Sequence, residues 1–452
     1  STAIVYHLYG ALARKDEAEI ASLMNLYRKA YHVFAVLVFA AGMAVLPFIH
    51  LFMKNNSYSL SYIRVLYAMW LVRTVLSYLL TYRKSLLIAD QKEYIASITG
   101  LILNVVSYLA IILLVTWEQN YLLALGIGTV TEVVLNIWIS WYVEQKYPFL
   151  RQRRKEKSTS SLTKRIVRDL KSLFISRISE KMLYCTDNLI ISGFIGVGTV
   201  GRYANYCMIT QAISNILTIL ANTIQPTVGD YFTEKNRQRN YEILRQLTFG
   251  FFCIASVVSV GLFSLITPFV RDIWLGPSYE LGWGITVFCI VVLLVRIMGL
   301  PLSLVMGVTG LFEKEKNVGA SSALLNLIVS LALVKPYGMA GVLLGTLLSY
   351  LLQILYRYII YFRDFLEMPG EALRYAQDIG EYLAVIAGEV LLMQKIVPLI
   401  YGAGGMLLFC VCFLLCIAIP LLLDLVIFGR GWRLQSLSLI HISEPTRRTP
   451  IS

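Results

Sequence analysis

The sequence predicts an all-α polytopic membrane protein. Of its 452 residues, 57% are hydrophobic and only 15% are charged. The mean hydropathy is +0.67, and apolar stretches of about twenty residues recur along the whole chain. A water-soluble domain has neither this composition nor this repetition of long apolar stretches.

Twelve apolar windows are long enough to cross about 30 Å of hydrocarbon as helices rising 1.5 Å per residue. They lie at 30–53, 61–82, 94–117, 121–143, 173–195, 200–224, 247–270, 285–309, 318–335, 339–362, 381–401 and 405–428. We expect each of these windows to form a transmembrane helix.

The formal charge of +13 comes from basic residues that gather in alternate connections between these windows. One side holds Arg83, Lys84 and the long run 146–171, whereas the opposite loops hold little beyond Lys54, Arg271 and Lys335. Basic loops face the cytoplasm. The charge therefore indicates orientation and attraction to anionic membrane lipids, and it argues against a nucleic-acid partner.

The long basic loop also predicts the domain organisation. Residues 1–172 are expected to form the remainder of an N-terminal lobe, 173–362 a C-terminal lobe and 363–434 two additional helices. The chain opens in what looks like the end of a span, so we expect that N-terminal helices are missing. The final segment, 435–452, contains LSLIHISEPTR, which resembles a translated sequencing adapter, and we expect it to be non-biological.

One window is unusually polar. The stretch SRISEKMLYCTDNLIISGF (176–194) contains four charged residues, Arg177, Glu180, Lys181 and Asp187. Each charge costs about 2.5–3.5 kcal/mol at mid-membrane. At 100° per residue, Arg177, Lys181 and Asn188 lie within about 60° of one another, so a charged stripe is expected to face a polar interior. Mutual ion pairing, such as Glu180 with Arg177, is the alternative explanation.

The next window carries an uncharged polar stripe at intervals of three and four residues. Its candidate glycan-facing residues are Gln211, Ser214, Asn215, Thr218, Asn222 and Gln225, together with Asn188 of the preceding window. Amide and hydroxyl groups both donate and accept hydrogen bonds, as sugar hydroxyls require. Hydrogen bonding between helices would explain one or two such residues.

Further charges lie deep in other windows. Arg73 and Arg296 are each flanked by apolar residues, and Glu132 lies in the window 121–143. Buried guanidinium groups bind phosphate oxygens in pairs of hydrogen bonds, so the candidate pyrophosphate-binding residues are Arg177, Lys181, Arg73 and Arg296. The carboxylates Asp187, Glu180 and Glu132 are candidates to bind H⁺ or Na⁺ as a coupling ion.

Other chemistries lack support in the sequence. The seven cysteines and four histidines are scattered without metal-ligand spacing, so no metal site or cofactor is expected. A membrane glycosyltransferase or polymerase would need an acidic pair near a membrane face, and the sequence has no D-x-D motif and no long external loop. We therefore expect no enzymatic activity.

Several motifs, in order, resemble those of the Wzx-type polysaccharide flippases of the multidrug/oligosaccharidyl-lipid/polysaccharide superfamily. They are LARKDEAEIASLMNLYRKAY (12–31), YRKSLLIADQKEYI (82–95), SRISEKMLYCTDNLIIS (176–192), VGRYANYCMI (200–209), IWLGPSYELG (273–282) and GLFEKEKN (310–317). The TDN triplet followed by YANY is the most specific part.

The resemblance implies a fourteen-helix plan with two six-helix lobes around a central cavity and two C-terminal helices. It also implies outward transport of undecaprenyl-diphosphate-linked oligosaccharide across the bacterial cytoplasmic membrane by alternating access, with a polysaccharide polymerase as a partner. The family's cavity cations and carboxylate carry over to Arg177, Lys181 and Asp187. The alternatives within the superfamily are a peptidoglycan lipid flippase and a multidrug exporter, and the buried cations argue against the exporter.

Overall fold

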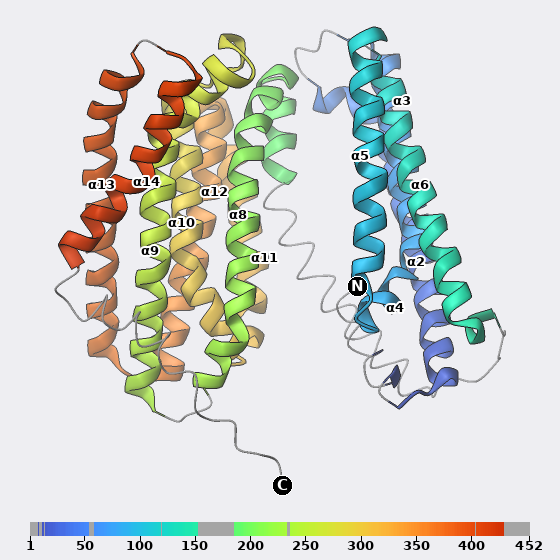
Figure 1. The fold of residues 1–452 in the computed structure, drawn as a ribbon, viewed down its shortest axis with the longest axis horizontal. Helices are drawn as coiled ribbons and strands as arrows, with labels where there is room; N and C mark the ends of the chain where they lie inside the picture. Colours follow the sequence, from blue (N-terminus) through green and yellow to red (C-terminus); the bar gives the residue numbers. More distant parts are fainter. Residues whose placement is uncertain are drawn as a thin grey trace. The chain divides into compact units, whose positions relative to one another are not determined.

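The computed structural model describes residues 8, 11–12, 14–53, 58–118, 120–151, 185–232, 236–402 and 404–428. All regular secondary structure in these residues is helical. The chain divides into two compact units, Ser1–Arg177 and Ile178–Ser452, and each is described by itself (Figure 1). The all-α polytopic fold class is confirmed.

The first unit is built from pairs of long helices. Helix α2 packs on α3, α3 on α6, and α6 on α5. The elements are α2 (Glu17–Val45), η1 (Leu46–Phe52), α3 (Leu60–Thr81), α4 (Lys84–Ala89), α5 (Glu93–Glu118), α6 (Tyr121–Lys146) and η2 (Pro148–Arg151).

Short polar side chains fix where these helices begin. Asp16 accepts a hydrogen bond from the Glu19 amide at the start of α2, and Ser59 accepts one from the Tyr62 amide at the start of α3. Asn120 does the same for α6. Each cap satisfies an amide that has no partner inside its own helix, which matters most where the chain enters hydrocarbon.

The buried core of the first unit lies at one end of the bundle. Tyr27 of α2, Leu86 and Leu87 of α4, and Val143 of α6 are fully buried there. Along the rest of α2 and α5, only 11% of the most apolar window is buried within the protein. Those apolar surfaces are suited to contact lipid.

The second unit is a larger bundle. Its elements are the helical residues 185–194, α8 (Val197–Tyr231), α9 (Arg237–Pro268), η3 (Phe269–Trp274), η4 (Pro277–Tyr279), α10 (Trp283–Val308), α11 (Phe312–Tyr337), α12 (Met339–Ile359), η5 (Ile360–Leu366), α13 (Pro369–Tyr401) and α14 (Met406–Phe428). Helix α10 packs against α8, α9 and α12, while α13 and α14 pack against α9.

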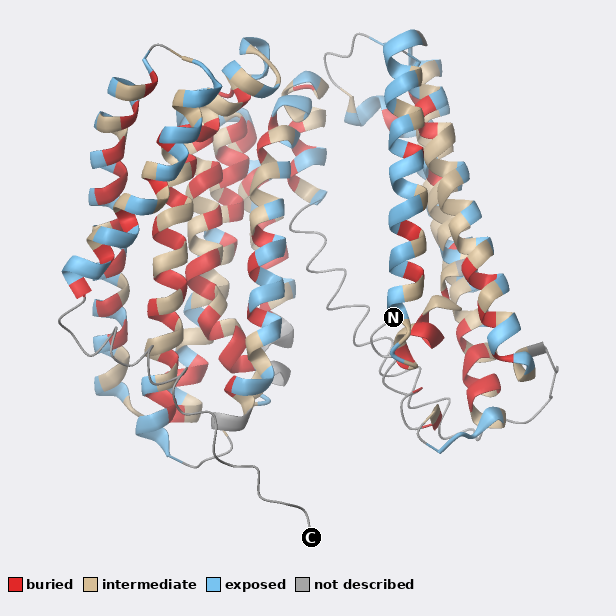
Figure 2. Ribbon diagram, viewed as in Figure 1, coloured by how far each residue is buried: buried red, intermediate tan, exposed pale blue. Residues whose placement is uncertain are grey.

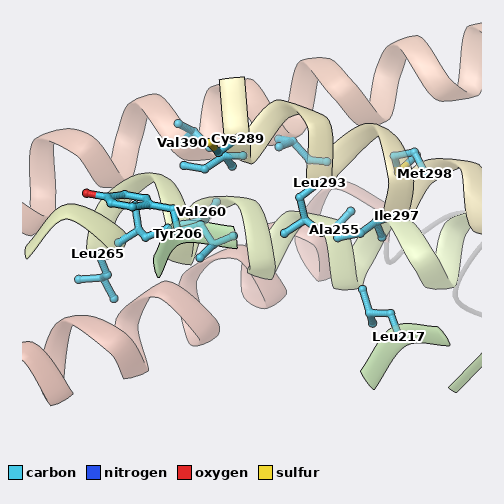
Figure 3. Close-up of a cluster of buried hydrophobic side chains, with 14 of the residues drawn as sticks. Tyr206, Leu217, Ala255, Val260, Leu265, Cys289, Leu293, Ile297, Met298 and Val390 are labelled. Atoms are coloured by element: carbon cyan, nitrogen blue, oxygen red, sulfur yellow. The ribbon is translucent and has the colours of Figure 1, made fainter. Parts of the chain in front are cut away.

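Helices α9 and α10 form the centre of this unit. Buried residues make up 61% and 50% of their apolar windows, compared with 17% in α8 and α14, and Figure 2 shows this contrast. Their side chains interdigitate in one core that includes Ala255, Val260, Leu293 and Ile297 (Figure 3). This core holds the helices that carry the polar groups described below.

Two glycines allow α11 and α12 to approach closely, as the spacing of Gly341 and Gly345 predicts. A Cβ atom at Gly341 would lie 2.3 Å from the Leu333 carbonyl oxygen, and one at Gly345 would lie 2.4 Å from Ser330 Oγ. Real Cβ atoms are essentially never so close to such neighbours, so both positions require glycine.

Eleven of the twelve predicted windows fall on described helices, and most of the window 173–195 lies outside the described residues. Among the described residues, ten helices are long and apolar enough to cross a membrane. The helices are longer than the windows, however: α2 begins at Glu17 and α13 at Pro369. Hydropathy detects only the apolar part of a helix and misses its amphipathic extension beyond the hydrocarbon.

Candidate functional site

A buried polar cluster joins three helices of the second unit. Asp187, from the helical residues 185–194, is 4% exposed, and Asn326 of α11 is fully buried. Thr346 Oγ1 of α12 donates a hydrogen bond to Asp187 Oδ2 at 2.6 Å. Asn326 Nδ2 donates to Thr346 Oγ1 at 2.8 Å and lies 3.4 Å from Asp187 Oδ1. The three side chains therefore form one hydrogen-bonded group, which we call the Asp187 cluster.

The glycine contact between α11 and α12 positions this cluster. Gly345 immediately precedes Thr346, and a Cβ there would lie 3.1 Å from the Asn326 carbonyl oxygen. Only the close approach of the two backbones brings the short Thr346 side chain within reach of Asn326. The step Gly341-x-x-x-Gly345 thus has a consequence for the site in addition to helix packing.

The Asp187 cluster has the donor set of a small hard cation. It offers carboxylate, amide and hydroxyl oxygens, the ligand types that such cations prefer. Asn326 Oδ1 is buried and accepts no hydrogen bond from any described residue, so it is available as a ligand. Among the described residues, no three His, Cys, Asp or Glu side chains converge to hold a transition metal. The cluster therefore fits Na⁺ or H⁺ better than zinc or iron.

Three of the predicted charged residues, Arg177, Glu180 and Lys181, lie outside the described residues. Asn188, the neighbour of Asp187, is exposed. Of the predicted stripe on residues 176–194, the structure thus places Asp187 in a buried cluster and Asn188 on the surface.

Arg73 and Glu132 meet inside the first unit. Arg73 Nε of α3 lies 2.6 Å from Glu132 Oε2 of α6. Its guanidinium carbon is also 5.1 Å from the centre of the Trp70 ring. Gly128, one turn before Glu132, leaves space for this guanidinium, because a Cβ there would lie 3.3 Å from Arg73 Nη1. The structure thus pairs a predicted anion-binding cation with a predicted coupling carboxylate.

Arg296 lies in the second unit, on α10. It is partly buried, and its guanidinium carbon is 5.5 Å from the centre of the Tyr350 ring of α12. This cation–π contact holds the side chain against the α10–α12 interface.

The polar stripe of α8 divides into two kinds of residue. The hydroxyls of Ser214 and Thr218 donate to the carbonyls of Thr210 and Ser214 within the same helix, so their donor capacity is used locally. Asn215 and Asn222 are exposed, whereas Gln211 and Gln225 are partly buried. The amide side chains are consequently the members of the stripe best able to contact a ligand.

Comparisons with known proteins agree with this architecture. The family model "Polysaccharide biosynthesis protein" matches residues 10–232. The fold is similar to "Lipid II flippase MurJ, inward closed conformation", with a TM-score of 0.63 and 14% identity, over 95% of this chain and 89% of that chain. The N-terminal part of the chain thus matches the family of polysaccharide biosynthesis proteins, and the fold as a whole is similar to that of a lipid flippase.

A second solved structure has a similar fold. A mutant form of the Vibrio cholerae MATE transporter VcmN has a TM-score of 0.50 and 12% identity, over 80% of this chain and 83% of that chain. No curated sequence matches the chain significantly. The two structural neighbours are named as a flippase and a transporter. With ten helices among its described residues that are long and apolar enough to cross a membrane, the chain is a multi-pass membrane protein.

Sequence reasoning missed two members of the Asp187 cluster, Asn326 and Thr346. A signal for Asn326 was present, because Ser322, Asn326 and Ser330 recur every four residues in an otherwise apolar window. That spacing predicts a polar face on one helix. Thr346 gave no such signal, since a single threonine in a span commonly bonds to its own backbone.

Proposed function

We propose that the protein is a Wzx-type flippase that moves undecaprenyl-diphosphate-linked oligosaccharide across the bacterial cytoplasmic membrane. The observation that carries the proposal is the match of residues 10–232 to the polysaccharide biosynthesis family, on a chain whose fold resembles a lipid flippase. Transport by alternating access moves the substrate without making or breaking a covalent bond, so no catalytic residue is required.

The diphosphate of the substrate needs buried cations. Arg177 and Lys181 are the proposed anchors, with Arg296 as a further candidate. Arg73 is a candidate only when it leaves Glu132, because that carboxylate holds its Nε in this structure. The exposed amides Asn215 and Asn222 of α8 are proposed to contact the sugar hydroxyls.

The Asp187 cluster is proposed to bind the coupling ion, H⁺ or Na⁺. Binding would neutralise a carboxylate that is 4% exposed, and it would tie three helices together when the ion is present. Loss of the ion would leave a buried charge that the described residues support with two hydrogen bonds, so the two states are expected to favour different helix packing.

The direct test measures glycan export in cells that carry the full-length protein. We expect Arg177→Ala and Lys181→Ala each to reduce export at unchanged protein level in the membrane. The matched control is Arg202→Ala, since Arg202 is exposed on α8. Wild-type export in both test variants would remove the proposed anchors.

A peptidoglycan lipid flippase is the second candidate, because the fold likeness to the Lipid II flippase is the stronger of the two and the same diphosphate chemistry applies. Rescue of cell-wall synthesis in a strain depleted of its own flippase would favour this candidate. Failure to rescue, together with export of lipid-linked oligosaccharide by the purified protein in vesicles, would favour the Wzx-type role. A polysaccharide polymerase and membrane lipids are the proposed partners.

A further inference from the structure

A second group of buried carboxylates lies outside the Asp187 cluster, where α13 and α14 pack on α9. Glu389 of α13 and Asp424 of α14 are each 3% exposed, and Ser256 of α9 is fully buried. Ser256 Oγ donates a hydrogen bond to Glu389 Oε2 at 2.6 Å. Glu389 and Ser256 also lie near enough to Asp424 to affect its carboxyl group, so the three side chains form one buried polar group.

Most of the oxygens in this group have no partner. Glu389 Oε1, Asp424 Oδ1 and Asp424 Oδ2 are buried and form no hydrogen bond within the described part of the chain. Both oxygens of Asp424 are therefore buried without a hydrogen bond of good geometry among the described residues, although Ser256 and the Glu389 carboxyl group lie nearby. A buried carboxylate normally accepts several hydrogen bonds or pairs with a cation.

The surroundings offer no neutralising charge. Within the described residues, no lysine, arginine or histidine forms an ion pair with either carboxyl group. The titratable neighbour from α9 is the Cys253 thiol. Arg245, eleven residues before Ser256 and thus about 16 Å away along α9, is held by both carboxylate oxygens of Asp378.

Aromatic rings lie along the same three helices, one or two turns from the carboxyl groups. Phe252 stacks on Tyr382 with ring centres 4.4 Å apart, and Phe428 packs on both rings at 5.5 and 5.7 Å. The aromatic rings make the surroundings of the two carboxyl groups apolar on this side. Two neighbouring ionised carboxylates repel each other strongly in apolar surroundings.

We propose that Glu389 and Asp424 form a proton-binding carboxyl pair. A proton taken from water forms an O–H bond to one carboxylate oxygen, removes one negative charge and supplies the hydrogen-bond donor that the free oxygens of the pair lack. A second proton makes the pair neutral. Release of these protons exposes the interface of α9 with α13 and α14 to charge repulsion, so the packing of the two last helices depends on pH.

The test compares the purified full-length protein with Glu389→Gln, Asp424→Asn and the double variant. Infrared difference spectra between about pH 5 and about pH 9, a range that brackets buried carboxyl titration, report the C=O band of protonated carboxyl groups. We expect a titrating band in the wild type that shrinks in each single variant and shrinks further in the double variant, and Asp187→Asn identifies any part of the band that comes from the Asp187 cluster. Glu381→Gln, on an exposed residue of the same helix, is the matched control and keeps the band.

Thermal unfolding supplies a second readout that does not depend on transport. Because the folded wild type holds a proton that the unfolded chain releases, its Tm is expected to fall as the pH rises, and the double variant is expected to lose most of this slope. A titrating band that is as large in the double variant as in the wild type would overturn the proposal. A Tm that depends on Na⁺ and not on pH, with a Na⁺ dependence that the double variant loses, would also overturn it. Glu389 and Asp424 would then bind a metal cation.

Discussion

Arg73 of α3 and Glu132 of α6, which are 59 residues apart in the sequence, are joined by an ion pair with an Nε–Oε2 distance of 2.6 Å. Each residue alone is an unexplained charge in an apolar window. Together they neutralise each other, and the pair links the two helix pairs α2–α3 and α5–α6 through the contact of α3 with α6.

Replacement of Glu132 by Gln should destabilise the first unit, because Arg73 keeps its charge and loses its counter-ion. We expect a loss of about 1–3 kcal/mol in the free energy of unfolding, measured as a lower Tm in detergent. The exchange Arg73→Glu with Glu132→Arg should recover at least half of the loss. If the single variant were as stable as the wild type, the pair would contribute nothing to the fold.

Asp187→Asn and Thr346→Val should each abolish stabilisation by the coupling ion. For an ion at ten times its Kd, the wild type gains about 1.4 kcal/mol, seen as a higher Tm in NaCl than in KCl. Thr309→Val is the matched control, since the Thr309 hydroxyl bonds to the Val305 carbonyl of its own helix. A Tm that does not respond to Na⁺ but has a pH response that Asp187→Asn removes would assign the cluster to H⁺. A Tm with neither a Na⁺ response nor a pH response that Asp187→Asn changes would contradict an ion site.

Gly345→Ala should force α11 away from α12 and disturb the Asp187 cluster. The new Cβ would lie 2.4 Å from Ser330 Oγ and 3.1 Å from the Asn326 carbonyl oxygen, so we expect a loss of about 1–3 kcal/mol. Gly388→Ala on α13 is the control, because its Cβ would meet no atom within 4 Å and alanine favours a helix by about 0.5–1 kcal/mol. Equal Tm values for the two variants would show that the close approach is not needed.

Acid should lower the stability of the first unit by protonating Asp90. This residue lies between α4 and α5 and accepts hydrogen bonds from Lys92 and Tyr147. Burial acts to raise the pKa of the Asp90 carboxyl, but these two hydrogen bonds outweigh it and hold the pKa below its usual range. The unfolded chain, with a carboxyl pKa of about 3.9, therefore binds the proton more readily than the folded protein. The stabilisation is complete above that pH and is lost as the pH falls through the folded pKa.

The measurement for this prediction is Tm between about pH 6 and about pH 3. Asp90→Asn should lower the Tm at neutral pH and flatten its acid dependence, and Tyr147→Phe should do so in part. An acid slope that is identical in Asp90→Asn and in the wild type would place the acid-sensitive group elsewhere.

The sequence was sufficient for the membrane class and for eleven of the twelve apolar windows, which fall on described helices, and it singled out Asp187 as a charge in an apolar window. Apolar length and local periodicity are properties of one helix, and so both can be recognised before the helices are assembled. The partners of Asp187 could not be named, because Thr346 is 159 residues away and meets it only after α12 packs against α11. The same limit applies to Arg73 and Glu132, which were singled out separately.

Glu389 and Asp424 show a different limit. Asp424 is the single acidic residue of the window 405–428, and Glu389 lies in the apolar middle of its window, eight residues from Glu381 and six from Lys395. Their significance arises from the packing of α13 and α14 on α9, which places both beside Ser256. A search for clustered charges along the sequence passes over such isolated residues, whereas burial in the folded structure reveals them.

The contacts between α9 and α13 also constrain how these helices can move. Arg245 with Asp378, and Ser256 with Glu389, are each separated by 133 residues, so the two helices run in the same direction with one fixed offset. Sliding α13 along α9 would break the Arg245–Asp378 ion pair and the Ser256–Glu389 hydrogen bond at the same time. Even a small displacement along the helix axis would therefore cost free energy. While both contacts are intact, we therefore expect α9 and α13 to move together, so that a change in their relative position requires the Ser256–Glu389 contact and the Arg245–Asp378 ion pair to be released.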